Sequence, residues 1–168
     1  MSEKKRLYVA YGSNLNLSQM EWRCPTAEVV GTAVLPDYEL LFRGSGDSAV
    51  ATVEPRKGAS VPILLWDIRP MDEKALDRYE GYPRLYEKET VTVSMGGEEV
   101  EAMAYVMTPG YEPGLPDQRY HDVIAEGYRS AGFDLSVLEA AVQRSAELMA
   151  APMEELAGRD GLQMWWPE

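Results

Sequence analysis

The chain of 168 residues has few of the side chains on which many catalytic and metal sites depend. It contains one cysteine, Cys24, and one histidine, His121. One cysteine excludes a disulfide framework and a multi-cysteine zinc site within this sequence, and one histidine excludes any site that needs two. Cys24 precedes Pro25 at an expected helix end and is interpreted as a small buried hydrophobic residue, whereas His121 is expected on a helix surface.

Basic residues and long apolar runs are scarce as well. The sequence has 16 Lys and Arg against 28 Asp and Glu, a formal net charge of −12. This balance argues against nucleic acid or an anionic membrane as the partner, because both require a basic surface. No apolar run approaches the about 18 residues that span a bilayer, and no signal-peptide pattern follows the first six residues. We therefore expect a cytoplasmic protein that binds neither nucleic acid nor membrane.

The hydrophobic pattern predicts a mixture of short strands and helices. Strands are predicted over residues 7–11, 26–35, 38–43, 49–53, 61–68, 90–95 and 98–107. Helices are predicted over residues 16–23, 73–79, 117–132 and 134–149, with Asp72, Asp117 and Asp134 as N-caps of the last three. Hairpin turns are expected at Pro36-Asp37 and Gly96-Gly97. Without a regular βαβ rhythm, this set predicts an α+β fold.

The length predicts one domain over residues 1–168, with residues 134–168 as a helical C-terminal extension. Residues 44–48 are rich in glycine but lack the lysine and the following helix of a phosphate-binding loop. They are therefore interpreted as a mobile loop near the functional site. At the other end of the chain, Trp165-Trp166 is expected to pack back on the domain. A lid over the site or a dimer contact is the alternative for this pair.

The stretch that organises the sequence is residues 7–15. An apolar strand stops at Gly12-Ser13-Asn14 and leads into the first helix. Glycine allows unusual backbone angles, and serine and asparagine bond readily to the nearby backbone. Such a strand-to-helix loop leaves backbone N–H groups available for a carboxylate or a carbonyl oxygen, although an ordinary turn would have the same composition.

A second stretch, residues 76–86, places the carboxylate of Glu80 on the last turn of a helix that ends at Gly81. The C-terminal end of a helix dipole is negative, so a partly buried carboxylate there should have a raised pKa. Aromatic residues surround Glu80 in the sequence, at Tyr79, Tyr82 and Tyr86. Taken alone, Glu80 would be interpreted as a solvated surface acid.

The two stretches in this order resemble the gamma-glutamyl cyclotransferase-like family, which includes the AIG2-like proteins. The resemblance covers about residues 6 to 133 and is carried by Tyr11-Gly12-Ser13-Asn14-Leu15, Leu76-Asp77-Arg78-Tyr79-Glu80-Gly81, Ala104-Tyr105-Val106-Met107 and Tyr120. It implies a small mixed β-barrel with surrounding helices and a site at one mouth of the barrel. It also implies an enzyme that converts a small-molecule γ-glutamyl amide into 5-oxoproline and a free amine, without metal or cofactor, as a monomer or homodimer.

The resemblance also implies roles for single residues. Glu80 matches the family's catalytic glutamate, which carries a proton as general acid and base. Residues that match the substrate-binding positions are Tyr8, Val9, Ala10, Tyr11, Gly12, Ser13, Asn14, Tyr105 and Tyr120. Asn14 is expected to steady the loop, and Tyr86 is a weaker candidate. Core packing with a satisfied hydroxyl is the alternative for Tyr105 and Tyr120.

One departure from the family leaves the leaving group open. Many members carry a glycine in the strand that corresponds to residues 61–66, where this chain has Pro62-Ile63-Leu64-Leu65. Residues 44–48 and 110–117 are expected to form the walls of the leaving-group pocket. Two other functions remain: a non-catalytic small-molecule binding domain on the same fold, and removal of a γ-glutamyl group from a larger metabolite.

Overall fold

The computed structural model describes residues 4–150, in which the chain forms five strands, four α-helices and one 3-10 helix. The strands are β1 (Arg6–Ala10), β2 (Glu28–Ser45), β3 (Ser48–Ile68), β4 (Tyr86–Met95) and β5 (Glu98–Met107). The helices are η1 (Ser13–Leu15), α1 (Leu17–Arg23), α2 (Pro70–Glu80), α3 (Gln118–Ala131) and α4 (Leu135–Ala150). Trp165-Trp166, which is predicted to pack back on the domain, lies outside the described residues.

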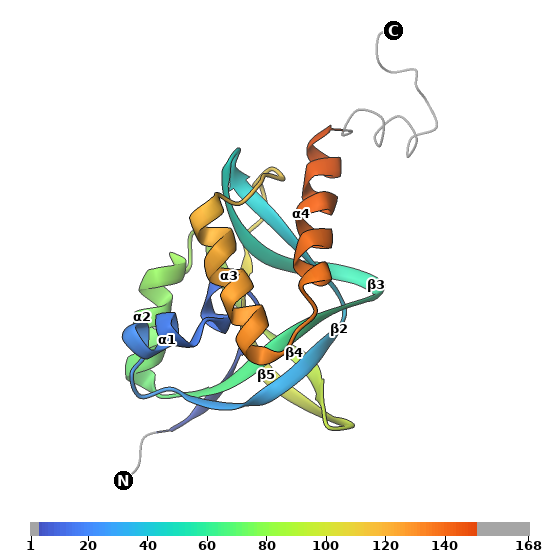
Figure 1. Ribbon diagram of the computed structural model, residues 1–168. Helices are drawn as coiled ribbons and strands as arrows, with labels where there is room; N and C mark the ends of the chain where they lie inside the picture. Colours follow the sequence, from blue (N-terminus) through green and yellow to red (C-terminus); the bar gives the residue numbers. More distant parts are fainter. Residues whose placement is uncertain (1–3, 151–168) are drawn as a thin grey trace, which may run out of the picture.

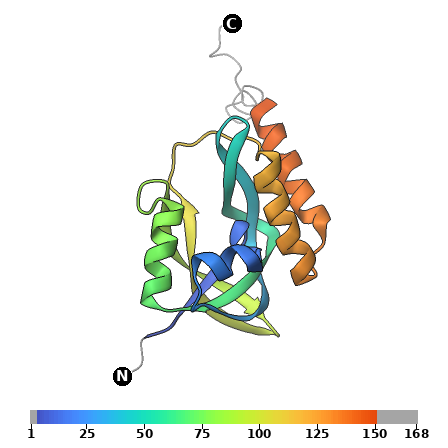
Figure 2. The ribbon, with the colours of Figure 1, turned by 60° about the vertical axis from the view of Figure 1, so that its left-hand side comes forward.

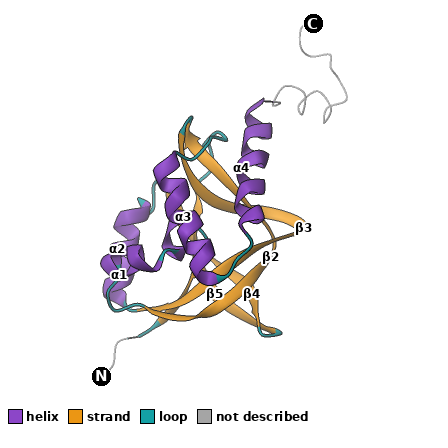
Figure 3. Ribbon diagram, viewed as in Figure 1, coloured by secondary structure: helices purple, strands orange, loops and turns teal. Residues whose placement is uncertain are grey.

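The five strands close into a barrel in the order β1-β3-β2-β4-β5 (Figure 1). Neighbouring strands are antiparallel, except that β5 closes the barrel by running parallel to β1. The helices lie outside the strands (Figure 3), with α2 on one side, α3 and α4 on the other and α1 between them (Figure 2). The predicted α+β fold, a small barrel with surrounding helices, is therefore confirmed.

The predicted hairpin at Pro36-Asp37 is wrong. Strand β2 runs on through these residues with a register shift between Pro36 and Tyr38, and Asp37 adopts a φ of 63°. The Asp37 carboxylate accepts a hydrogen bond from the Gly58 N–H at 2.9 Å, so β3 continues past the same irregularity. The four predicted strands over residues 26–68 are therefore two long strands, which bend together at a β-bulge.

The predicted mobile loop at residues 44–48 is the tip of the β2–β3 hairpin. The segment that precedes α3 is fastened to this tip by backbone hydrogen bonds of 2.8–3.0 Å. They run from Gly44 N–H to Glu112, from Gly114 N–H to Phe42, from Leu115 N–H to Gly46 and from Ala49 N–H to Leu115. A Cβ on Gly114 would lie 2.9 Å from the Ala49 Cβ, so only glycine allows this close approach. The tip is therefore a hydrogen-bonded structure.

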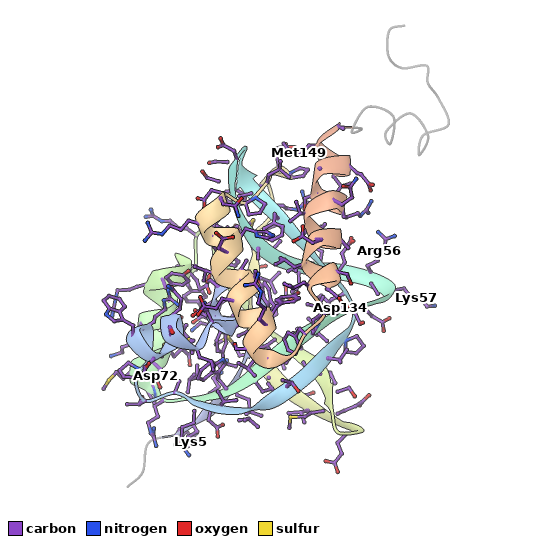
Figure 4. The ribbon with its side chains drawn as sticks, in the orientation of Figure 1. Lys5, Arg56, Lys57, Asp72, Asp134 and Met149 are labelled. Carbon is purple, nitrogen blue, oxygen red and sulfur yellow. The ribbon has the colours of Figure 1, made fainter. Side chains whose placement is uncertain are left out.

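Helix α2 starts three residues before the predicted position. The helix begins at Pro70, which loses nothing at the first helical position because it has no N–H to satisfy. Asp72 is therefore the third helical residue, and its carboxylate accepts from the Arg69 N–H at 3.0 Å and the Thr26 hydroxyl at 2.7 Å. Figure 4 labels Asp72 at this end of α2 and Asp134 at the start of α4.

The other expected caps and the second hairpin are confirmed. Asp117 accepts from the Tyr120 N–H and Asp134 from the Ser136 N–H, so each carboxylate caps its helix. The β4–β5 hairpin turns between Met95 and Glu98. None of the helices described for residues 4–150 combines the length and the apolar character that crossing a membrane requires.

Candidate active site

The candidate site is a cavity of about 250 Å³ at the end of β1. Its walls come from the loop after β1, from β3, from the end of α2 and the segment that follows, from β4 and β5, and from the start of α3. The lining residues are Tyr8, Tyr11, Gly12, Ser13, Asn14, Val50, Ala51, Tyr79, Glu80, Leu85, Tyr86, Tyr105 and Tyr120. The two sequence motifs, the glycine loop and Glu80, therefore meet in one cavity.

The loop after β1 presents unused backbone donors. It is buried, and in the part of the chain that the structure describes no backbone carbonyl accepts from the N–H groups of Gly12, Ser13 or Asn14. A Cβ on Gly12 would lie 3.2 Å from the Ala51 Cβ and 3.7 Å from the Tyr120 hydroxyl. Glycine thus lets the loop approach β3 closely, and the N–H groups are available to a bound oxygen atom.

Helix α3 holds the loop from outside. A Cβ on Gly127 would lie 2.6 Å from the Leu15 Cβ and 3.0 Å from the Asn16 backbone nitrogen, so the helix backbone lies directly against η1. The Asn16 side chain donates to the Val123 carbonyl at 3.0 Å and accepts from the Gln19 N–H at 3.1 Å, which caps α1. The position of the loop therefore depends on α3 as well as on β1.

Glu80 is the last residue of α2. Gly81 follows in the left-handed conformation, with a φ of 68°, and ends the helix. Burial raises the pKa of the Glu80 carboxyl to about 7, and the positive charge of Arg23 acts against this rise. No described residue donates a hydrogen bond to this carboxylate or forms an ion pair with it, so Glu80 can exchange a proton near neutral pH.

The cavity tyrosines differ in where their hydroxyl protons point. Three of them donate to acceptors within the protein: Tyr11 to the Tyr105 carbonyl at 2.6 Å, Tyr86 to the Ala51 carbonyl, and Tyr105 to Asp77 at 2.5 Å. Among the hydrogen bonds within residues 4–150, two hydroxyls only accept: Tyr8 from the Asn14 amide at 2.9 Å and Tyr120 from the Ala51 N–H at 3.0 Å. Tyr8 and Tyr120 therefore keep a proton for a ligand in the cavity.

These two hydroxyls stay protonated at neutral pH. Burial, followed by the charge of Glu80, raises the pKa of Tyr8 well above the ordinary 10.0 of tyrosine. Burial likewise raises the pKa of Tyr120, although its bond from the Ala51 N–H acts in the opposite direction. Both side chains are thus hydrogen-bond donors across the working range of most enzymes.

The structure brings together most of the residues predicted for the site. Val9 and Ala10 are the exceptions: both are buried in β1, opposite Leu65 and Leu64, and neither lines the cavity. Their part in substrate binding stays a prediction. Asn14 accepts from Arg23 and donates to Tyr8, a geometry that fits its expected role in steadying the loop.

The predicted walls of the leaving-group pocket do not line the cavity. Residues 44–48 and 110–117 contribute nothing to the cavity lining, whereas the nearby Val50 and Ala51 do.

His121 lies outside the cavity and bonds to Glu139 at 3.1 Å, and Cys24 is buried, as predicted. Within residues 4–150, no three His, Cys, Asp or Glu side chains are grouped to hold a metal ion.

Sequence reasoning missed Arg23. Its guanidinium lies 3.5 Å from the centroid of the Tyr79 ring and bonds to Asn14, so it touches both motifs. The only signal in the sequence is its position in the last turn of α1, where a basic residue is common because it favours the helix dipole.

Comparisons with known proteins show the family of this chain. The family model for gamma-glutamyl cyclotransferase, AIG2-like, matches residues 8–128. The gamma-glutamylcyclotransferase of Bos taurus is 32% identical over 138 residues, which cover 77% of this chain and 73% of the bovine protein. That of Homo sapiens is 30% identical over 146 residues, covering 82% and 77%. A solved structure of a gamma-glutamyl cyclotransferase superposes with a TM-score of 0.72 at 28% identity and covers 88% of both chains. The chain therefore belongs to the gamma-glutamyl cyclotransferase, AIG2-like family of enzymes.

Proposed function

We propose that this protein cyclises a compact γ-glutamyl amide, with Glu80 as the general acid and base. The α-amine of the γ-glutamyl group attacks its own side-chain carbonyl carbon, the amide C–N bond breaks, and 5-oxoproline and a free amine are released. The observation that carries the proposal is that Glu80 and the unused N–H groups of residues 12–14 line one cavity.

The main task of the protein in this reaction is to fold the substrate. The nucleophile and the electrophile belong to one molecule, and effective molarities of well-oriented intramolecular reactions reach about 10⁵ to 10⁸ M. A cavity of about 250 Å³ is smaller than the roughly 300–1,000 Å³ of sites for drug-sized ligands. This size favours a small γ-glutamyl compound over a γ-glutamyl group on a large metabolite.

Glu80 carries the proton between the two nitrogen atoms. At neutral pH the substrate amine is an ammonium group, because the pKa of such an amine lies above 7. The Glu80 carboxylate, whose pKa burial raises to about 7, takes one proton from it and passes this proton to the leaving nitrogen after the attack. The second proton that the attacking nitrogen loses follows the same route, so the freed amine departs as an ammonium ion. An ordinary carboxylate with a pKa near 4.5 would be a weaker base for the same transfer.

The loop and two tyrosines supply the donors for the negative charge. Attack turns the carbonyl oxygen into an oxyanion, and N–H groups of Gly12, Ser13 and Asn14 are free to bind it or the substrate carboxylate. The hydroxyls of Tyr8 and Tyr120 add two protonated side-chain donors. One such donor is worth about 3 to 4 kcal/mol of transition-state stabilisation.

The experiment is the release of 5-oxoproline from a panel of γ-glutamyl amino acids, glutathione and γ-glutamyl amines. We expect 5-oxoproline and the free amine in equal amounts from at least one compound, and the best compound identifies the leaving group. Folded protein that releases 5-oxoproline from none of them contradicts the proposal. Calorimetric binding of the same panel without turnover would then indicate the alternative, a non-catalytic binding domain. A cytoplasmic location stays a prediction.

A further inference from the structure

Arg23 connects three parts of the molecule through one side chain. One nitrogen of its guanidinium donates to the Asn14 side-chain oxygen, and the other donates to Gln19, four residues earlier in the chain, at 2.9 Å. The face of the guanidinium lies 3.5 Å from the centroid of the Tyr79 ring. Three contacts on one planar group hold a long side chain in a single orientation, as the fixed fork of arginine allows and the point charge of lysine does not.

Two of the three contacts of Arg23 lead to groups in the cavity. Asn14 donates to the hydroxyl of Tyr8, one of the two tyrosines with an available proton. Tyr79 precedes Glu80, and its hydroxyl bonds to the Ser13 hydroxyl at 2.8 Å. Arg23 thus lies at the junction of the loop after β1 and the last turn of α2, which carry the donors and the carboxylate.

Arg23 also supplies a positive charge that acts on the Glu80 carboxylate. Burial raises the pKa of Glu80 and the guanidinium of Arg23 lowers it. Arg23 itself does not line the cavity, and the titratable side chains that share the cavity with Glu80 are the phenols of Tyr8, Tyr11, Tyr79, Tyr86, Tyr105 and Tyr120. A phenol carries no positive charge, so the guanidinium is the cation that favours the ionised carboxylate.

A capping role for Arg23 does not account for these contacts. A basic residue in the last turn of a helix stabilises it through the dipole and through bonds to the final carbonyls. The hydrogen bonds of Arg23 within the described residues go to the side chains of Asn14 and Gln19 instead.

We propose that Arg23 is a positioning residue: it fixes the loop through Asn14 and the end of α2 through Tyr79, and so sets how the loop donors and the Glu80 carboxylate face one substrate. This inference rests on the proposed function. Two substitutions separate the charge of Arg23 from its planar fork, because lysine keeps the charge without the fork and glutamine keeps neither.

The test compares Arg23→Gln, which removes the charge, with Arg23→Lys, which keeps the charge but loses the fork and the stacking. Arg78→Gln is the matched control, because Arg78 lies exposed on α2, two residues before Glu80, and no described side chain bonds to it. Two quantities are measured for each variant: the pH profile of kcat/KM for 5-oxoproline release, and the titration of the Glu80 carboxyl by carbon-13 NMR.

We expect Arg23→Gln to lose up to about 100-fold in kcat/KM and to shift both the acid limb and the Glu80 titration to higher pH. Arg23→Lys should lose rate while its acid limb stays near that of the wild type, and Arg78→Gln should match the wild type in both. If Arg23→Gln keeps the wild-type rate and titration, or if Arg78→Gln shifts them equally, the inference is wrong.

Thermal unfolding shows whether Arg23→Gln folds; if it does not, Arg23→Lys provides the rate comparison. A wild type that releases no 5-oxoproline would refute the proposed function and not the coupling. In that case the NMR titration decides: an upward shift in Arg23→Gln supports the link between Arg23 and Glu80, and an unchanged titration overturns it.

Discussion

Two carboxylates on α2, Asp77 and Glu80, lie one turn apart in very different surroundings. Asp77 accepts from the Tyr105 hydroxyl at 2.5 Å and forms an ion pair with Lys88 at 3.1 Å. Lys88 also bonds to Glu73 at 2.5 Å, which in turn pairs with Arg6. Glu80 has no such partner among the described residues and faces the cavity, where burial raises its pKa to about 7.

The difference shows what separates a structural carboxylate from a reactive one. Both acids belong to the same motif and lie near the end of the same helix, so a carboxylate in this region does not by itself indicate a reactive group. The Asp77 carboxylate pairs with the ammonium group of Lys88 and accepts a hydrogen bond from the Tyr105 hydroxyl, and both partners hold it in place. Glu80 is desolvated and the charge of Arg23 offsets this only in part, which makes its protonated and ionised forms nearly equal in free energy at neutral pH. Substitutions of the two should therefore affect different properties.

The largest effect is expected from Glu80→Gln against Asp77→Asn. Glu80→Gln removes the proton carrier and should lower kcat by about 10² to 10⁴-fold, with the fold intact. Asp77→Asn removes the charge that pairs with Lys88 and weakens the bond from Tyr105, and should lower the free energy of unfolding by about 1 to 3 kcal/mol, with kcat within a few-fold of the wild type. Steady-state kinetics and urea unfolding of both variants provide the measurement. The comparison fails if Asp77→Asn loses as much kcat as Glu80→Gln.

A second pair of variants compares a tyrosine whose hydroxyl proton is available to a ligand with one whose proton is bonded to the protein. Tyr120 and Tyr86 both bond to the peptide groups of Ala51, but only Tyr120 keeps its own proton for a ligand. Tyr120→Phe should lower kcat by about 10² to 10³-fold if its hydroxyl stabilises the oxyanion. Tyr86→Phe loses a comparable bond to Ala51 and should mainly lower stability. Equal losses of kcat in the two variants would show that these hydroxyls only hold Ala51.

The raised pKa of Glu80 should also make the free energy of unfolding depend on pH. Its folded pKa is raised from 4.5 to about 7, so the folded state binds more protons than the unfolded state between these values. The free energy of unfolding of the wild type therefore falls as pH rises from 4.5 to about 7, by on the order of 3 kcal/mol relative to that of Glu80→Gln. Above pH 7 the difference between the two proteins is constant. Urea unfolding of both proteins from pH 4 to 8 measures it. A difference that does not change with pH would mean that Glu80 titrates normally.

The smallest effect concerns how α3 holds the loop. Alanine normally stabilises a helix relative to glycine by about 0.5 to 1 kcal/mol. At Gly127, however, a Cβ would lie 2.6 Å from the Leu15 Cβ, so Gly127→Ala should push on η1, cost about 1 to 3 kcal/mol and raise KM. Gly46→Ala is the control, because a Cβ there meets nothing within 4 Å. Thermal unfolding and KM measure the outcome; a stabilised Gly127→Ala with unchanged KM would contradict this packing.

The sequence predicted the parts of the molecule that local rules govern. The strand, loop and helix around Gly12, the caps at Asp117 and Asp134 and the glycine hairpin follow from backbone preferences. The bulge at Asp37 does not, because Pro36-Asp37 has the composition of a turn and only pairing with β3 carries the strand through it. The resemblance identified Glu80, but its missing partner depends on the tertiary structure.

The hydroxyl protons and Arg23 could not have been predicted either. Whether a tyrosine donates or accepts depends on which peptide group lies opposite it, as Ala51 does for Tyr86 and Tyr120. The contact of Arg23 with Tyr79 joins α1 to α2 across the fold, and no pattern in either segment specifies it.

The most direct test of the central claim is the pH dependence of kcat/KM for the wild-type enzyme with its best γ-glutamyl substrate. If the free Glu80 carboxylate accepts the substrate proton, kcat/KM should fall about tenfold for each pH unit below an apparent pKa of about 7, and Glu80→Gln should lack this limb. An acid limb near 4.5, or the same limb in Glu80→Gln, would contradict the account, because the proton would then be carried by another group.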